Sequence, residues 1–158
     1  MVKRIGVPFV AGLWCVSMLA AVASCRKQIK DGARLTSYSQ HITSAVKDFT
    51  VKAGETYSLN IKVTNTGVEP WFGGGVVGRV DASYRWYDAK GKLLPLEGAR
   101  APLNRLHIPP GESDELLLPV TAPGAAGNYT LWVSMVQEGY DWFFARGAQP
   151  LVLKVAVQ

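Results

Sequence analysis

The sequence predicts an all-β protein: one β-sandwich of about seven strands, preceded by a signal peptide and a polar tether. Two observations lead to this prediction. From Asp48 onward, apolar and polar residues alternate in short runs separated by Gly and Pro, and no long segment shows the 3.6-residue apolar spacing of a helix. The 158 residues, 48% of them apolar, are enough for one core and few for two domains. The expected division is therefore residues 1–24, 25–46 and 47–158.

Residues 1–24 have the pattern of an export signal. Lys3 and Arg4 precede an uncharged, apolar run over residues 5–24. The run ends in Val22-Ala23-Ser24-Cys25, which resembles the lipobox of bacterial lipoproteins. The resemblance implies a mature chain that begins at a lipidated Cys25. Two alternatives remain: a secretory signal cut after Ala23, or an uncleaved membrane anchor, since about 20 apolar residues also span a bilayer. All three export the domain.

Lipidation at Cys25 has consequences for the fold and the location. Cys15 is removed with the signal and Cys25 carries lipid, so no cysteine remains for a disulfide and the sandwich must be stable without one. The residue after the cysteine is Arg26 and not Asp, which by the family's sorting rule implies the outer membrane in a Gram-negative cell. We therefore expect a membrane partner through the lipid anchor and a location in the cell envelope.

The charge distribution argues against nucleic-acid binding. The formal net charge is +5, but Lys3 and Arg4 lie in the signal and the remaining basic residues form no stripe. A small basic group beside the expected anchor, Arg26, Lys27 and Lys30, is suited to anionic lipid head groups.

Residues 26–45 are polar and mixed, and we expect a tether with one early strand around residues 35–42. The clearest strand is 57–64, whose odd-numbered residues are apolar and whose even-numbered residues are polar. A second alternation covers 80–87 and runs into the turn Asp88-Ala89-Lys90-Gly91, with residues 92–96 returning as a hairpin. Residues 98–110 form a long connection to a strand at 115–120, where Pro119 indicates a sheet edge or a bulge.

Two more alternating segments, 129–136 and 151–157, complete the predicted strands. Tyr129, at the start of its strand after Gly127-Asn128, is placed as in a tyrosine corner, whose phenol bonds back to the backbone. Trp86, on the apolar face of its strand, is expected to fill the centre of the core. These features favour an immunoglobulin-like sandwich without its disulfide, and a small β-barrel is the second candidate.

Known catalytic and metal-binding patterns are absent from the sequence. It contains no HExxH, GxSxG or Gly-rich phosphate loop between a strand and a helix, and its two histidines lie in the expected tether and in a proline-rich loop. Glu138 and Asp141 are the only carboxylate pair that suggests glycoside hydrolysis, and they are more simply explained as solvated loop acids. We therefore predict a protein that is not an enzyme and needs no cofactor or metal.

The expected loops carry aromatic and charged residues suited to sugar binding. Aromatic rings stack on the C–H faces of sugars, while carboxylates and guanidinium groups bond hydroxyls. The predicted ligand-binding residues are Trp71, Arg100, Glu138, Trp142 and Arg146. The alternative is structural: Trp142 and Phe143 plug the end of the sandwich, and Glu138 pairs with Arg146.

Residues 49–157 resemble an immunoglobulin-like module found in bacterial surface proteins and beside glycosyltransferases and other polysaccharide enzymes. The resemblance rests on several short motifs, among them Asn65-Thr66-Gly67 with Trp71, Tyr84-Arg85-Trp86-Tyr87-Asp88, Pro109-Pro110-Gly111-Glu112 and Val136-Gln137-Glu138-Gly139. The Asn-Thr-Gly element with Trp71 also resembles the four-tryptophan domain of autophagy cargo receptors, a protein-binding sandwich. Together with the expected lipid anchor and the missing catalytic patterns, the resemblance leads us to expect a lipid-anchored, non-catalytic protein that binds a cell-surface polysaccharide or its biosynthetic machinery. The alternative is a structural lipoprotein that docks an envelope protein, for example by strand addition.

Overall fold

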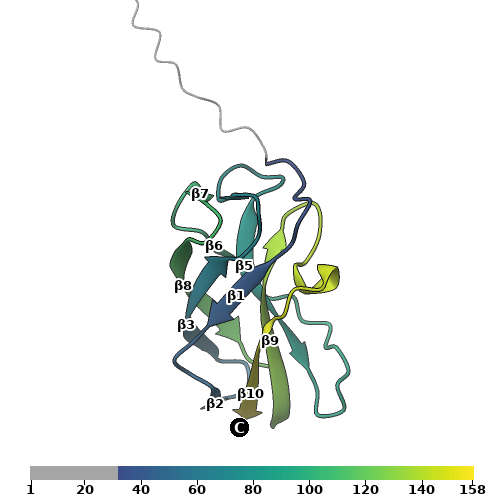
Figure 1. The fold of residues 1–158 in the computed structure, drawn as a ribbon. Coiled ribbons are helices and arrows are strands. Elements are labelled where there is room, and N and C mark those ends of the chain that lie inside the picture. Colours follow the sequence, from purple (N-terminus) through teal and green to yellow (C-terminus); the bar gives the residue numbers. More distant parts are fainter. Residues whose placement is uncertain (1–31) are drawn as a thin grey trace, which may run out of the picture.

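The computed structural model describes residues 32–158, which form a β-sandwich with a single short 3-10 turn, η1 (Phe144–Arg146) (Figure 1). The signal peptide, Cys25 and the first part of the expected tether lie outside the described residues. Three of the strands have only two residues: β4 (Trp71–Phe72), β6 (Ala101–Pro102) and β7 (His107–Ile108). The longer strands are β1 (Gln40–Thr43), β2 (Asp48–Val51), β3 (Thr56–Asn65), β5 (Val80–Tyr87), β8 (Ser113–Thr121), β9 (Gly127–Gln137) and β10 (Leu151–Val157).

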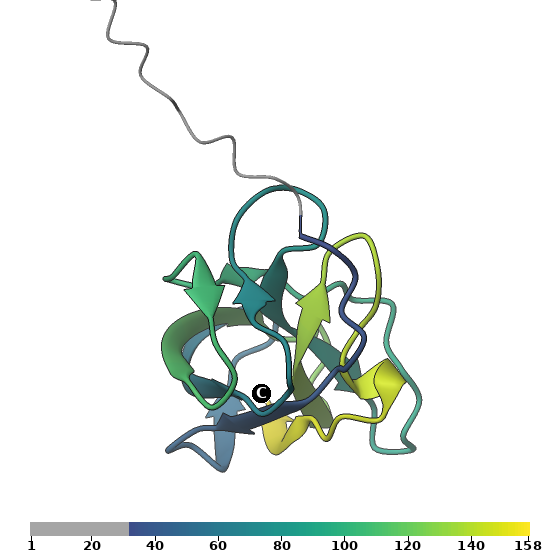
Figure 2. The same cartoon turned by 45° about the horizontal axis from the view of Figure 1, so that its top comes forward.

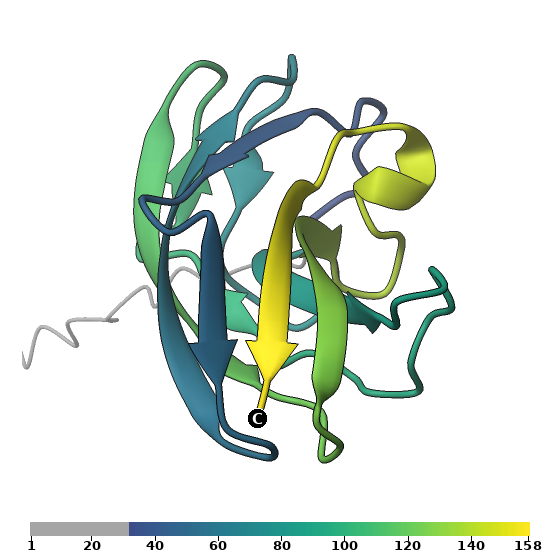
Figure 3. The ribbon, with the colours of Figure 1, turned by 90° about the horizontal axis from the view of Figure 1, so that it is seen from below.

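Two sheets pack face to face in the order β1-β3-β8 and β2-β10-β9-β5-β6, and β4 pairs with β7 as a separate ribbon. Figure 3 shows β10 between β2 and β9. All pairings are antiparallel except that of β2 with β10, which is parallel. The predicted immunoglobulin-like sandwich without a disulfide is confirmed. No helix in residues 32–158 is long and apolar enough to cross a membrane.

The period-two alternation of the sequence explains the core. Leu59, Ile61 and Val63 of β3 are buried, while the residues between them face solvent or are half-buried. Trp86 of β5 is fully buried as predicted, and its indole N–H donates to the carbonyl of Thr121 at 2.9 Å. The tyrosine corner is also present, because the Tyr129 hydroxyl donates to the carbonyl of Ala125 at 3.0 Å.

The predicted polar tether is wrong for its described part, residues 32–46, except that the early strand expected around residues 35–42 is present as β1. Residues 32–46 pack onto the sandwich: β1 pairs with β3, and Leu35 and Ile42 are buried in the core. Buried amide side chains hold this segment. Gln137, 1% exposed, accepts from the Leu35 backbone N–H at 3.0 Å and donates to the carbonyl of Ala33 at 2.7 Å. Gln40 accepts from the Met135 N–H at 2.8 Å. The domain therefore begins before residue 47.

Two strand predictions differ from the structure: one expected strand is almost absent, and one strand that is present was not expected. Residues 92–96 return from the predicted turn but form only one bridge, Leu93 to Tyr87. Conversely, β2 was not predicted as a separate strand, although its parallel pairing with β10 places it at the edge of the five-stranded sheet. Pro119 lies in β8, which is an edge strand of the three-stranded sheet, as its presence indicated.

Candidate functional site

The outer face of the five-stranded sheet carries a group of aromatic and charged side chains. Because β5 points Trp86 inward, its neighbours Arg85 and Tyr87 face outward. In β9, Trp132 likewise faces outward between the buried Leu131 and Val133, and it lies opposite Arg85 in the register. Together with side chains from the following loops they form what we call the arginine–aromatic surface, which consists of Arg85, Tyr87, Arg100, Trp132, Glu138, Trp142 and Phe144.

The aromatic rings of this surface form a continuous row. The ring centroids of Tyr87 and Trp132 are 4.7 Å apart, those of Trp132 and Phe144 are 5.8 Å apart, and those of Phe144 and Trp142 are 5.3 Å apart. All four residues are half-buried. They are thus held by their mutual contacts, and each residue keeps part of its surface exposed.

The loop after β9 brings Trp142 to this face. The loop turns back along β9, with the Gln137 N–H donating to the Asp141 carbonyl at 2.9 Å and the Phe143 N–H donating to the Met135 carbonyl at 3.0 Å. Phe143 then points into the core, where it is fully buried against Trp71, while Trp142 and Phe144 on either side of it remain half-buried. Phe143 therefore plugs the core, as one alternative expected, while Trp142 and Phe144 beside it belong to the arginine–aromatic surface.

Two guanidinium groups hold Trp142. The Cζ atoms of Arg85 and Arg100 lie 4.8 Å and 5.3 Å from its ring centroid, within the range of cation–π contacts. Arg100 is also fixed by Glu138, with Nε and Oε1 2.5 Å apart, and its Nη1 donates to the hydroxyl of Ser83 at 3.0 Å. This network leaves little side-chain freedom to lose when a ligand binds.

Asp81 lies beneath this network on the same strand face. It is fully buried, one carboxylate oxygen accepts from Arg79 Nε at 2.8 Å, and the other has no hydrogen-bond partner among the described residues. Burial raises the pKa of Asp81 above its ordinary value, and the charge of Glu138 adds to this effect, whereas Arg79 opposes it. Because Asp81 has no exposed surface, it supports the site without reaching a ligand.

Two predicted ligand residues do not belong to this surface. Trp71 is fully buried in β4, with its ring 5.5 Å from that of Phe143, so its prediction as a ligand-binding residue is wrong. Arg146 pairs with Asp141 at 2.6 Å and not with Glu138, and Arg34 binds the same carboxylate oxygen at 2.8 Å. These bonds, from Arg146 first and Arg34 second, lower the pKa of Asp141. They form a separate polar cluster.

Sequence reasoning grouped Arg100, Glu138 and Trp142, which the structure brings together, but it missed Arg85, Tyr87, Trp132 and Phe144. A signal for the first three was present: a large aromatic or arginine on the polar face of an alternating strand. Their meeting depends on the β5–β9 register, which places Arg85 opposite Trp132. That register is set by the fold and not by either strand alone.

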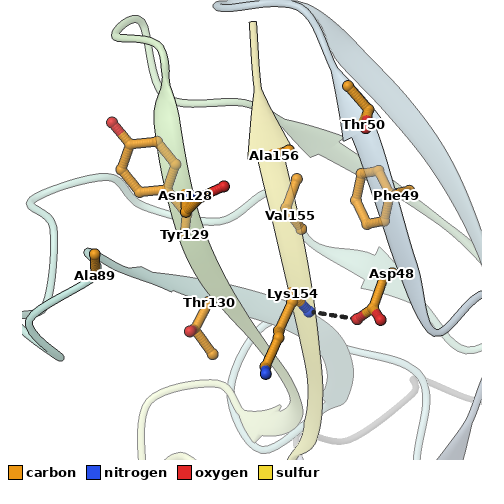
Figure 4. A pocket seen from close by; sticks show the side chains of 10 residues that line it. All are labelled: Asp48, Phe49, Thr50, Ala89, Asn128, Tyr129, Thr130, Lys154, Val155 and Ala156. Carbon is orange, nitrogen blue, oxygen red and sulfur yellow. Dashed lines mark hydrogen bonds between the residues drawn. The ribbon is translucent and has the colours of Figure 1, made fainter.

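A shallow hollow of about 430 Å³ lies farther along the outer face of the same sheet (Figure 4). Asp48, Thr130 and Lys154 line it, and the Lys154 backbone N–H donates to Asp48 Oδ1 at 3.2 Å. Thr130 lies opposite Tyr87 in the β5–β9 register, so the hollow adjoins the arginine–aromatic surface. Residues 32–158 contain no group of three or more His, Cys, Asp or Glu side chains that could hold a metal ion.

No model of a protein family matches the chain, and no curated protein matches its sequence. Solved structures give distant similarities. A family 123 glycoside hydrolase from Clostridium perfringens is 12% identical over 70% of this chain, with a TM-score of 0.35, and this chain spans only 22% of its length. A CARDB domain from Pyrococcus furiosus, in complex with two metal ions, is 17% identical over 80% of this chain and 95% of its own, with a TM-score of 0.39. An alkylpurine DNA glycosylase from Pseudomonas fluorescens is 13% identical over 80% of this chain and 32% of its own, with a TM-score of 0.44. Similarities of this size carry no argument about function.

Proposed function

We propose that this protein is a lipid-anchored, non-catalytic component of a bacterial cell envelope that binds a polysaccharide through the arginine–aromatic surface. The observation that carries the proposal is the row of four half-buried rings on the outer face of β5 and β9, with Arg85 and Arg100 beside it. Aromatic rings on the solvent side of a sheet are unusual unless a ligand or partner uses them.

The chemistry of the surface suits sugars. The accessible parts of Trp132 and Trp142 offer flat apolar area for the C–H face of a pyranose ring, and Arg100 and Glu138 offer donors and acceptors for hydroxyl groups. Catalysis is not supported, because the carboxylate with the raised pKa, Asp81, is fully buried and Glu138 is bound to Arg100.

The shape of the surface favours a chain over a small molecule. Small ligands bind in concave pockets that enclose most of their surface. Here, the rings continue along the sheet into the shallow hollow at Thr130 and Lys154. A ligand made of several linked sugars can contact both regions at once, and each contact adds to the affinity.

The charge of the surface favours an acidic polysaccharide. Arg85 and Arg100 converge on Trp142, and among the described residues Glu138 is the only carboxylate paired with either arginine. In the adjoining hollow the charge of Lys154 is offset by that of Asp48, so the excess positive charge lies at the two arginines. A guanidinium group that forms no ion pair can take a ligand carboxylate in a bidentate, charge-assisted pair. Arg85 is the residue in this position.

The alternative function, docking of an envelope protein by strand addition, has less support. Strand addition needs a long, open sheet edge. The edges of the five-stranded sheet are β2 with four residues and β6 with two, and those of the other sheet are β1 with four residues and β8, which contains Pro119.

Intrinsic tryptophan fluorescence tests the polysaccharide proposal. The soluble chain, residues 26–158, is titrated with surface polysaccharide purified from the source organism, before and after chemical reduction of its carboxyl groups. We expect a saturable shift with the native polymer and a weaker one with the reduced polymer. Arg85→Ala should weaken binding about tenfold or more, which corresponds to one lost charge-assisted pair.

Arg105→Ala is the matched control, because Arg105 pairs with Glu112 away from the surface. Its affinity should equal that of the wild type. The absence of a saturable shift with the native polymer, or equal affinities of the two arginine variants, would contradict the proposed site. The mass of the full chain purified from membranes tests the anchor separately, since acylation at Cys25 adds the mass of its acyl chains.

A further inference from the structure

One end of the sandwich carries most of the exposed apolar side chains. Of the nine large hydrophobic residues that are exposed in the described part of the chain, five lie on the loops at the end where residue 32 meets the domain. We call this the N-terminal end, and its exposed apolar residues are Val68, Val76, Val77, Leu106 and Tyr140, with exposed fractions of 76%, 77%, 40%, 54% and 41%. Figure 2 turns this end toward the reader, and the last residue of β10 lies at the opposite end in Figure 1.

Backbone hydrogen bonds join these loops. The Gly73 N–H donates to the Leu106 carbonyl at 2.8 Å, which connects the β4–β5 loop to the β6–β7 loop. The Gly78 N–H donates to the Glu138 carbonyl at 2.8 Å, which connects the β4–β5 loop to the loop of Tyr140. The loops that carry Val76, Val77, Leu106 and Tyr140 are therefore joined to one another, and we call this end with its exposed apolar residues the platform.

The chain enters the domain at the same platform. The Gly32 N–H donates to the Val77 carbonyl at 3.0 Å. Gly78, with φ of 80°, lies so close to Gly32 that a Cβ atom on Gly78 would collide with the carbonyl oxygen of Gly32. Gly32, the first described residue, is thus held against the β4–β5 loop.

The number of residues before this point limits how far the platform can lie from an anchor. Seven residue steps separate Cys25 from Gly32, so an extended chain spans at most about 25 Å. By comparison, the ten residue steps of the eleven-residue β9 alone extend over roughly 34 Å. Arg26, Lys27 and Lys30 lie within the seven steps and are attracted to anionic head groups.

We propose that the N-terminal end docks on the surface of a lipid bilayer, with Val76, Leu106 and their apolar neighbours at the boundary between head groups and acyl chains. This inference rests on the proposed lipid anchor at Cys25. Small aliphatic tips with a tyrosine at their edge suit shallow insertion, in which the apolar part is buried and the phenol stays hydrated. Docking of this end places the strands roughly perpendicular to the membrane, so that the arginine–aromatic surface faces sideways and is exposed to water.

Site-specific fluorescent labels test the docking. The full chain is produced in a bacterial host, purified with its lipid and reconstituted into vesicles of phosphatidylethanolamine and phosphatidylglycerol. Val76→Cys and Leu106→Cys are labelled with an environment-sensitive dye. Ala126→Cys, in the exposed turn at the start of β9, and Leu117→Cys, 58% exposed on β8, are the matched controls.

At positions 76 and 106 we expect a blue-shifted emission that nitroxide-labelled lipids quench at least twice as strongly as the emission at 117 and 126. Equal quenching at all four positions would overturn the docking. A blue shift in vesicles that nitroxide-labelled lipids do not quench would assign the platform to a second copy or another protein and would overturn the docking as well.

The same preparation separates failure of the docking from failure of the anchor. The wild-type chain has only Cys15 and Cys25, so an acylated mature chain has no free thiol and does not take up the dye. A wild-type chain that is labelled and lacks the mass of acyl chains would overturn the anchor and, with it, the docking. An acylated chain with unquenched labels at 76 and 106 would overturn the docking alone. Val76→Asp should lose docking and keep polysaccharide binding, since Val76 lies outside the arginine–aromatic surface.

Discussion

Replacing Gln137 with Leu should release the N-terminal segment from the sandwich and destabilise the domain. The Gln137 side chain accepts from the Leu35 N–H at 3.0 Å and from the Tyr38 hydroxyl at 2.9 Å, and it donates to the carbonyls of Ala33 at 2.7 Å and Gly78 at 3.1 Å. Leucine has a similar size and can form none of these bonds, so the change removes hydrogen bonds with little change in packing volume.

The expected loss follows from which partners stay buried. The bonds to the Leu35 N–H and the Gly78 carbonyl are buried, whereas those to Ala33 and Tyr38 are half-buried, so water can replace them. An unsatisfied buried polar group costs about 1–3 kcal/mol, and two such groups give a loss of about 2–6 kcal/mol in the free energy of unfolding. For a domain of this size, the melting temperature should fall by roughly 6–30 °C.

Urea unfolding measures the loss, and hydrogen exchange locates it. The Leu35 amide should lose protection by more than the global loss of stability, because its segment detaches before the sandwich unfolds. Gln149→Leu is the matched control, since the Gln149 side chain is exposed, and it should change stability by less than about 0.5 kcal/mol. A loss below about 1 kcal/mol in Gln137→Leu, or unchanged protection at Leu35, would refute the view that Gln137 holds the segment.

Three further predictions test the core and its charges. Trp86→Phe should destabilise the domain by about 1–2 kcal/mol more than Trp71→Phe in urea unfolding. The reason is that the Trp86 N–H donates to the Thr121 carbonyl at 2.9 Å, while the buried Trp71 N–H has no partner among residues 32–158. Equal losses in the two variants would contradict this prediction. Tyr129→Phe should cost about 1 kcal/mol in the same assay, and an unchanged midpoint would show that the corner bond contributes nothing. The pKa of Asp81 is raised in the native state, so the native protein keeps this proton to higher pH than the unfolded chain does. The free energy of unfolding should therefore fall as pH rises from about 4 through the native pKa. Asp81→Asn should remove this fall, and a variant with the same pH profile as the wild type would contradict the prediction.

Much of the sandwich follows from the sequence because its long strands alternate strictly. The alternation in β3, β5 and β9 identifies the inward residues, and Pro119 marks an edge. The short strands could not be predicted in the same way. Trp71 lies in a two-residue strand paired with Ile108, 37 positions later in the chain, and the strand is followed by Gly73-Gly74-Gly75, which is typical of a loop. Its burial depends on this distant pairing.

The N-terminal segment was misjudged for a different reason. Glutamine, serine and threonine usually lie at the surface, so a segment rich in them indicates a tether. In the fold, Gln40 is buried because its amide bonds Ser134 at 3.0 Å and the Met135 N–H at 2.8 Å. The composition of the segment itself does not indicate these partners, because they lie in β9, far away in the sequence. The same limit applies to the arginine–aromatic surface, where Arg100, Glu138 and Trp142 were predicted but their contact with Arg85 depends on the sheet register.

The parallel pairing of β2 with β10 has a mechanical consequence. Residue 32 meets the domain at one end and β10 finishes at the other (Figure 1). A pull that separates the two ends draws β2 and β10 past each other along their length, so that their four paired residues, Asp48 to Val51 against Lys154 to Val157, carry the load together. Bonds loaded together in shear resist more force than bonds that open one after another. A load applied between residue 32 and the C-terminal end of β10 is therefore borne across this strand pair.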